Sequence, residues 1–176
     1  MKNLLLALTL PFIAILFTAF QPSPIGNGAT IKWYTWEEAI ELNKENPKKI
    51  FIDVYTDWCH WCKVMDKNTF TDADVIEYMN EHFYAVKFNA EQREDVQFSD
   101  HTFKFIAQGR RGVHELAYAL LDGRLSYPSV VYLNEKLERI TVSPGYKKPD
   151  QIINELKFVG EEHYTNKTWQ EYTTGQ

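Results

Sequence analysis

The sequence feature that most constrains the fold is a short apolar run followed closely by two cysteines. Residues 50 to 55, Ile-Phe-Ile-Asp-Val-Tyr, are nearly all β-branched or aromatic, which is typical of a strand buried on both faces. Cys59 and Cys62 follow within a few residues, and a helical pattern continues from Lys63 to Lys67. A strand that passes directly into a helix places Cys59 at the N-terminus of that helix.

The rest of the chain predicts a mixed α/β domain. Thr35-Trp36-Glu37-Glu38 has the pattern of a capping box, which starts a helix that ends near Asn46. The other expected elements are a helix at 74–80, a strand at 83–88, a β-hairpin of 129–133 with 137–142, and a helix at 149–160. This order predicts a central mixed β-sheet with helices on both faces.

Residues 98–121 also show a helical pattern, interrupted by Gly109 and Gly112. The second half of this segment carries one apolar stripe, formed by Val113, Leu116, Ala117, Leu120 and Leu121. We expect the stripe to be part of the core.

The two ends of the chain differ from this middle part. Lys2 precedes an apolar run from Leu4 to Phe20, so 1–24 is predicted to be a secretory signal or an uncleaved N-terminal anchor. The remaining chain is then expected outside the cytoplasm. Residues 25–160 suffice for one domain with a single core, and 161–176 form a polar tail with scattered aromatic residues.

Composition excludes several classes of protein. Aromatic residues make up 15% of the chain, which argues against disorder. The net charge is −5 with acids and bases interspersed, so we expect no nucleic-acid partner. Two cysteines are too few for a disulfide scaffold, and a bridge that closes so short a loop adds little stability.

The spacing of Cys59 and Cys62 therefore favours chemistry over a structural role. The helix N-terminus stabilises a thiolate at Cys59, and Cys62, one turn further on, is close enough to form a disulfide with it. A tetrahedral metal site would need ligands that no second CxxC or HxxxH motif supplies. A c-type haem is disfavoured because Lys63, rather than histidine, follows Cys62. A relay for copper or another metal through both thiolates and a histidine remains an alternative.

The sequence resembles thioredoxin-like proteins over most of residues 33–160. The resemblance rests on Asp53 through Cys62, on Lys87, on Tyr127-Pro128 and on Gly145, in the order that this family shows. It implies a thioredoxin-like α/β fold and thiol–disulfide exchange. His-Trp stands between the cysteines where the family most often has Gly-Pro, and the extended motif is similar to an exported or atypical branch. The long stretch before Pro128 makes 98–121 look like a helical insertion.

The resemblance also implies roles for three residues outside the motif. Pro128 matches the cis-proline that faces the dithiol and leaves the neighbouring backbone free to pair with an extended substrate segment. Asp53 matches the buried acid that relays protons to the second cysteine. A carboxyl group within an apolar strand is expected to be partly buried with a raised pKa. Lys87 matches the lysine near that acid, although a lysine on a sheet face can also extend to water.

The remaining predicted site residues surround the dithiol. Trp58 and Trp61 are expected to form an apolar platform for substrate, together with Tyr127 and Pro128. His60, when protonated, would stabilise the Cys59 thiolate, but it would have little effect as a solvent-facing helix residue. The other histidines show no ligand spacing and are expected to be structural or exposed: His82, His101, His114 and His163.

Taken with the resemblance, these residues predict an exported disulfide reductase for protein substrates. Cys59 would attack the substrate disulfide, and Cys62 would resolve the intermediate. No small-molecule cofactor is expected, and electrons would come from a redox partner. Contact with a membrane is expected only through an uncleaved N-terminal segment. The alternatives are an oxidase or isomerase of the same fold, a metal-handling chaperone, and a binding module without turnover.

Overall fold

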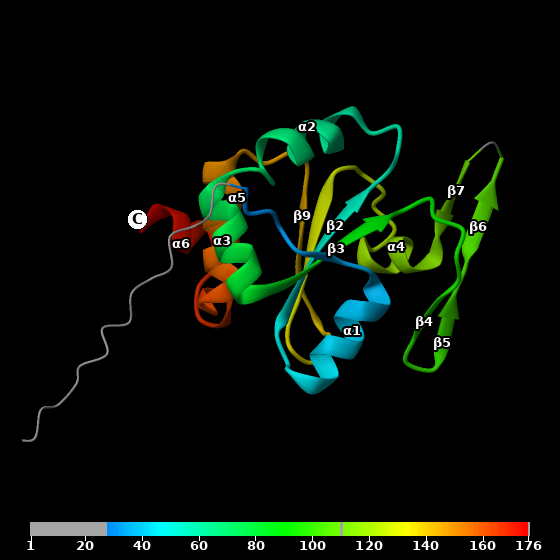
Figure 1. Ribbon diagram of the computed structural model, residues 1–176, viewed down its shortest axis with the longest axis horizontal. Coiled ribbons are helices and arrows are strands. Elements are labelled where there is room, and N and C mark those ends of the chain that lie inside the picture. Colours follow the sequence, from blue (N-terminus) through cyan, green and yellow to red (C-terminus); the bar gives the residue numbers. More distant parts are fainter. Residues whose placement is uncertain (1–27, 110, 176) are drawn as a thin grey trace, which may run out of the picture.

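The central sheet has five strands in the order β1-β3-β2-β8-β9 (Figure 1). The computed structural model describes residues 28–109 and 111–175, so the expected segment 1–24 lies outside the described residues. The strands of the sheet are β1 (Trp33–Tyr34), β2 (Lys49–Tyr55), β3 (Phe83–Asn89), β8 (Ser129–Leu133) and β9 (Arg139–Pro144). Strands β1, β3 and β2 are mutually parallel, whereas β8 runs antiparallel to β2 and to β9. The predicted mixed sheet is confirmed.

Helices cover both faces of this sheet (Figure 1). They are α1 (Trp36–Glu45), α2 (His60–Asn68), α3 (Ala73–His82), α4 (Glu115–Leu120), α5 (Pro149–Gly160) and α6 (Trp169–Thr174). The predicted capping box of α1 is present: the Glu38 N–H donates to the Thr35 hydroxyl at 3.2 Å, and the Thr35 N–H donates to the Glu38 carboxylate at 2.8 Å. Pro149 is the first residue of α5, as predicted.

Alternation along β2 separates two apolar cores. Ile50, Ile52 and Val54 point into the core that α1 and α4 cover. Phe51 points into the other core, together with Met65 of α2 and apolar residues of α3 and α5. Asp53 follows Phe51 on this second face, where an ionised carboxylate is costly.

The prediction of a helical segment at 98–121 was wrong. This part of the chain forms two β-hairpins, and only α4 at its end is helical. The hairpins pair β4 (Val96–Phe98) with β5 (His101–Phe103) and β6 (Phe105–Gln108) with β7 (Arg111–His114). They lie beside α4 at the right of Figure 1.

Backbone conformation explains the difference. Ser99 and Gly109 have φ values of +53° and +61° at the two hairpin turns, a conformation that ends a helix. At Gly112 a Cβ atom would lie 2.2 Å from the Phe105 ring, so this ring packs against the glycine backbone. The expected apolar stripe is buried, but Val113 reaches the core from a strand.

The polar tail at 161–176 is partly helical. A 3-10 turn (His163–Thr165) leads to α6, which Thr168 and Glu171 begin with a capping box. The rings of Trp169 and Tyr172 pack on Phe158 of α5, with centroids 5.3 Å and 5.2 Å away. The scattered aromatic residues therefore attach the tail to the domain.

Candidate active site around the Cys59–Cys62 disulfide

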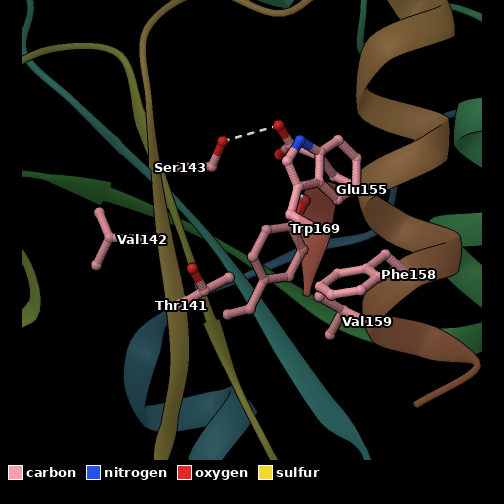
Figure 2. Close-up of a pocket in the computed structure, with 8 residues that line it drawn as sticks. Thr141, Val142, Ser143, Glu155, Phe158, Val159 and Trp169 are labelled. Carbon is pink, nitrogen blue, oxygen red and sulfur yellow. Dashed lines mark hydrogen bonds between the residues drawn. The ribbon is translucent and has the colours of Figure 1, made fainter. Parts of the chain in front are cut away.

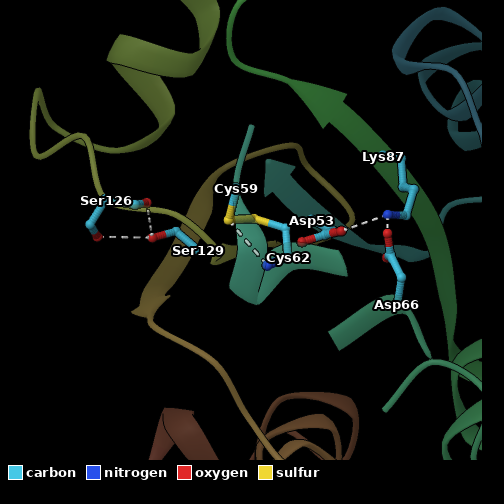
Figure 3. The surroundings of a disulfide bond; sticks show 7 residues. All are labelled: Asp53, Cys59, Cys62, Asp66, Lys87, Ser126 and Ser129. Carbon is cyan, nitrogen blue, oxygen red and sulfur yellow. Dashed lines mark hydrogen bonds and ion pairs between the residues drawn. A yellow bond between two sulfur atoms is a disulfide. The ribbon is translucent and has the colours of Figure 1, made fainter. Parts of the chain in front are cut away.

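The two cysteines form a disulfide where β2 passes into α2 (Figure 3). Cys59 is the N-cap of α2, and the backbone N–H of Cys62 donates to its Sγ atom at 3.1 Å. In most N-caps an oxygen accepts this hydrogen bond; here a sulfur does. The same donor and the helix dipole would stabilise a thiolate at Cys59 when the pair is reduced.

Both cysteines are largely covered. Cys59 is 4% exposed and Cys62 is 3% exposed, so only a small part of either residue reaches the surface. An attacking thiol at Cys59 is therefore nearly buried. In contrast, the side chains that directly precede the two cysteines, Trp58 and Trp61, are 49% and 54% exposed.

Asp53 lies on the face of β2 that borders the second core. It is 1% exposed, and its Oδ1 atom has no hydrogen-bond partner among the residues that the structure describes. Burial raises the pKa of the Asp53 carboxyl to about 6, while the nearby Lys87 ammonium opposes this rise. In Figure 3 the carboxyl group lies between the disulfide and Lys87. A group with this pKa can accept and release a proton near neutral pH.

Lys87 reaches Asp53 because the two are register partners on the parallel strands β2 and β3. Its Nζ atom lies 3.1 Å from Asp53 Oδ2 and also donates to Asp66 of α2. The ammonium lies 4.8 Å from the centroid of the Tyr55 ring and 5.3 Å from that of Trp33, within the range of cation–π interactions. The predicted proximity of Lys87 to Asp53 is therefore present; its role in catalysis stays a prediction.

Sequence reasoning missed Asp66. A signal was available, because Asp66 stands four residues after Cys62 and such residues share one face of a helix. Its partner Lys87 lies on another strand, so the contact itself depends on the sheet register.

The predicted substrate-binding residues Tyr127 and Pro128 lie beside the motif. The Tyr127–Pro128 peptide bond is cis, as predicted. Trp61, Tyr127 and Pro128 line a hollow of about 230 Å³, together with Gly145 and Tyr146. The Gly145 N–H donates to the Pro128 carbonyl at 2.8 Å. The backbone N–H and C=O of Tyr127 make no hydrogen bond within 28–109 and 111–175.

Trp58 is held from three sides. Its ring meets Tyr127 edge to face at 6.0 Å, its Nε1 donates to Glu91 at 3.1 Å, and the Arg111 guanidinium lies 4.3 Å above its ring. Glu91 and Arg111 were not predicted, because Arg111 reaches Trp58 only through the β6–β7 hairpin. His60 is exposed at the first position of α2, with its ring 5.7 Å from that of Trp61.

Another cavity, of about 200 Å³, lies between β9, α5 and α6 and contains none of the predicted site residues (Figure 2). Its one acid, Glu155, accepts hydrogen bonds from Ser143 at 2.8 Å and Tyr132 at 3.3 Å. Burial raises the pKa of Glu155. Within the described ranges no group of three or more His, Cys, Asp or Glu side chains is placed to hold a metal ion.

Comparison with known proteins identifies the family. The family model described as "Protein of unknown function, DUF255" (Thioredox_DsbH) matches residues 26–171. The chain belongs to this family. This DUF255 chain is also 33% identical over 129 residues to uncharacterized protein B0495.5 of Caenorhabditis elegans, and 36% identical over 67 residues to spermatogenesis-associated protein 20 of Rattus norvegicus.

These relatives are much longer proteins. The matches cover 73% and 38% of the DUF255 chain but only 16% and 8% of the two relatives. Two solved structures share the fold, each with a TM-score of 0.56. One is a thioredoxin-fold protein from Helicobacter pylori (19% identity, 74% of this chain and 80% of that one), and the other is "DsbH Oxidoreductase" (17% identity, 80% and 91%). The thioredoxin-like fold with its CxxC pair is confirmed.

Proposed function

We propose that this protein is a thiol–disulfide oxidoreductase. The observation that carries the proposal is the Cys59–Cys62 disulfide at the N-terminus of α2, together with the buried Asp53 carboxyl on the preceding strand β2. A disulfide that only stabilises the fold needs no buried acid with a pKa near neutrality. Thiol–disulfide exchange, in contrast, needs a group that takes up a proton. A solved structure of the same fold described as an oxidoreductase supports this reading.

The proposed reaction begins with the reduced pair. The Cys59 thiolate attacks one sulfur of a substrate disulfide, which forms a mixed disulfide and releases the other substrate sulfur as a thiolate. Cys62 then gives its proton to Asp53 and attacks Cys59. The Cys59–Cys62 bond forms, and the second substrate sulfur leaves with the electron pair. The substrate is reduced by two electrons, and the protein ends in its disulfide form.

Substrate would bind at the aromatic surface around the disulfide. Trp58 and Trp61 present apolar area there, and the hollow beside Pro128 also includes Tyr146. An extended segment of a protein substrate can pair with the backbone groups of Tyr127. This arrangement favours protein disulfides over small ones.

We further propose that the chain is exported and acts as a reductase. The apolar run before residue 21 supports export. A dithiol outside the cytoplasm remains reduced only if a redox partner supplies electrons, and such a partner is part of the proposal. Oxidase or isomerase activity is the runner-up, since a protonated His60 next to Cys59 would favour the thiolate and thus a more oxidising pair.

The experiment that tests exchange is substrate trapping with Cys62→Ser. This variant should accumulate mixed disulfides through Cys59 in extracts of the native compartment, because the resolving thiol is missing. The double variant Cys59→Ser, Cys62→Ser is the matched control and should trap nothing. Stoichiometric metal binding by the wild type without trapped partners would instead favour the metal-handling alternative. A partner retained by the double variant would indicate a binding module.

The reduction potential then decides the direction. The Cys59–Cys62 pair is equilibrated with glutathione, and the oxidised fraction is measured. A potential near or below about −250 mV supports a reductase, since thioredoxin, at about −270 mV, lies in this part of the scale. A potential of about −120 to −180 mV is that of an oxidant or isomerase and would contradict the proposed direction.

A further inference from the structure

One ammonium group serves two acids at the candidate active site. Lys87 Nζ lies 3.1 Å from Asp53 Oδ2 and donates a hydrogen bond to Asp66 Oδ1 (Figure 3). The two acids differ in environment: the Asp53 side chain is 2% exposed and the Asp66 side chain is 42% exposed. The Lys87 ammonium therefore bridges a buried carboxyl and a carboxylate at the surface.

Sharing the ammonium changes the balance at the buried acid. When one cation is paired with two carboxylates, it favours the ionised form of each carboxylate less than it would favour the ionised form of a single partner. The negative charge of Asp66 also acts directly on Asp53 and raises the pKa of its carboxyl, although burial is the largest cause. Both effects make Asp53 a stronger proton acceptor than it would be beside Lys87 alone.

Other charged or titratable groups around this cluster are few. From β2 comes Tyr55, whose ring lies 4.8 Å from the Lys87 ammonium, and from the turn after β2 comes Asp57, whose charge acts on Tyr55. From α2 comes Cys62 (Figure 3). Tyr55 contributes a neutral phenol, whose pKa is raised by burial. The strands β1 and β8 contribute Trp33 and Val130, which carry no charge. Asp66 is thus the charged group of α2 that acts on the Asp53–Lys87 pair.

We propose that Asp66 is a positioning residue: by holding the Lys87 ammonium toward the surface, it determines how readily Asp53 takes the proton of Cys62. The inference rests on the proposed function and deepens it. In the step concerned, the Cys62 S–H bond breaks and its proton moves to Asp53. The Cys62 sulfur forms a bond to Cys59, and the bond between Cys59 and the substrate sulfur breaks with release of a substrate thiolate. Asp66 takes no proton in this step.

The test uses Asp66→Asn, a change that removes the charge and keeps the shape. The first measurement follows the Asp53 carboxyl of the oxidised chain by carbon NMR between pH 4 and 8, which requires no turnover. With Lys87 left to Asp53 alone, the ionisation constant of Asp53 should rise about threefold to tenfold, so its titration midpoint moves to lower pH. Glu77→Gln is the control, because Glu77 is an exposed acid on the adjacent helix α3.

The second measurement is the pH profile of the rate at which the reduced chain cleaves a peptide disulfide. Asp66→Asn should move the acid limb of the profile to lower pH by the same factor, and Asp66→Glu should restore the wild-type limb. A purely structural contribution would lower the rate equally at every pH. If Asp66→Asn unfolds, Asp66→Ser replaces it in both measurements.

An unchanged Asp53 titration in the variant would overturn the inference, even if the wild type proves to be an active exchange enzyme. A shifted titration with an inactive wild type would retain the coupling between Asp66 and Asp53 while the proposed function fails. A shifted titration with an unshifted rate profile would overturn the role in proton transfer.

Discussion

At the scale of single residues, Asp53 is a carboxyl group held in an apolar environment. Its carboxyl is fully buried, and one of its oxygens lacks a partner among the described residues. The raised pKa means that the folded state holds a proton more tightly than the unfolded state between pH 3.8 and about 6. The stabilising contribution is complete below this window and is lost as the pH rises through it.

Asp53→Asn should therefore stabilise the oxidised protein at neutral pH. A neutral amide avoids the cost of burying a charge, and we expect the free energy of unfolding at pH 8 to rise by about 1–3 kcal/mol. This increase in unfolding free energy should be smaller than the free energy that corresponds to the whole pKa shift, because Lys87 loses one of its two carboxylate partners. Denaturant unfolding at pH 8 and pH 4 checks this. The difference should shrink toward pH 4, and an equal difference at both values would contradict the argument.

At the scale of elements, the sequence predicted the other helices and strands better than the segment 98–121. The strands around 50–55 and 129–133 and the capping box at Thr35 were correct, because burial on both faces and local hydrogen bonds leave clear patterns. The 98–121 segment failed because its hairpins are defined by turn conformation at Ser99 and Gly109 and by cross-strand packing. The contact of Arg111 with Trp58 depends on the β6–β7 hairpin, and that of Asp66 with Lys87 depends on the sheet register, so neither was predicted.

Gly112→Ala should disrupt the β6–β7 hairpin. The new Cβ would lie 2.2 Å from the Phe105 ring and 2.4 Å from the Ile106 carbonyl oxygen. We expect a loss of about 1–3 kcal/mol in unfolding free energy, together with a change in Trp58 fluorescence as Arg111 moves off its ring. Gln108→Ala, on the exposed surface of the same hairpin, is the control and should change neither. Wild-type fluorescence in Gly112→Ala would show that the hairpin does not hold Trp58.

The start of α4 should be sensitive to pH. The His114 ring is fully buried as the N-cap: Nδ1 accepts from the Leu116 N–H at 3.2 Å, and Nε2 donates to the Glu94 carbonyl at 3.0 Å. Burial lowers the pKa of His114, so its stabilising contribution is present above about pH 6.5 and is lost as the pH falls through the folded pKa.

Hydrogen exchange at Leu116 checks this prediction locally. After correction for the intrinsic pH dependence, protection of the Leu116 amide should fall between pH 7 and pH 5. His114→Asn keeps a side-chain acceptor for this amide and should remove the pH dependence. Equal pH dependence in both proteins would contradict the assignment.

At the scale of the whole molecule, the sheet and its helices bring distant segments to one end of the domain. Trp58 and Trp61 come from the motif, Tyr127 from the approach to β8, and Tyr146 from the segment before α5. These side chains surround a disulfide that is itself almost buried. Within the described residues, no helix has both the length and the apolar character needed to cross a membrane.

This surface should separate large substrates from small ones. Trp58→Ser with Trp61→Ser removes the two exposed tryptophan rings next to the cysteines, so KM for a protein disulfide should rise about tenfold or more, since single aromatic anchors contribute about 1 kcal/mol or more. Reduction of oxidised glutathione should change by less than about twofold. Tyr118→Ser, which removes an exposed aromatic ring on α4, is the control. An equal loss of activity toward the protein disulfide and toward oxidised glutathione would mean that the tryptophans act on the dithiol itself.

The sulfur N-cap of α2 links folding to electron transfer. The Cys62 N–H that meets the Cys59 sulfur would bind a thiolate more strongly than a disulfide sulfur, because hydrogen bonds to charged acceptors are stronger. In a thermodynamic cycle, the difference in unfolding free energy between the oxidised and reduced forms equals the difference in reduction free energy between the folded and unfolded chains. A substitution that changes this cap therefore changes both quantities by the same amount, so an engineer cannot adjust the potential of the pair there while leaving the relative stability of its two redox forms untouched.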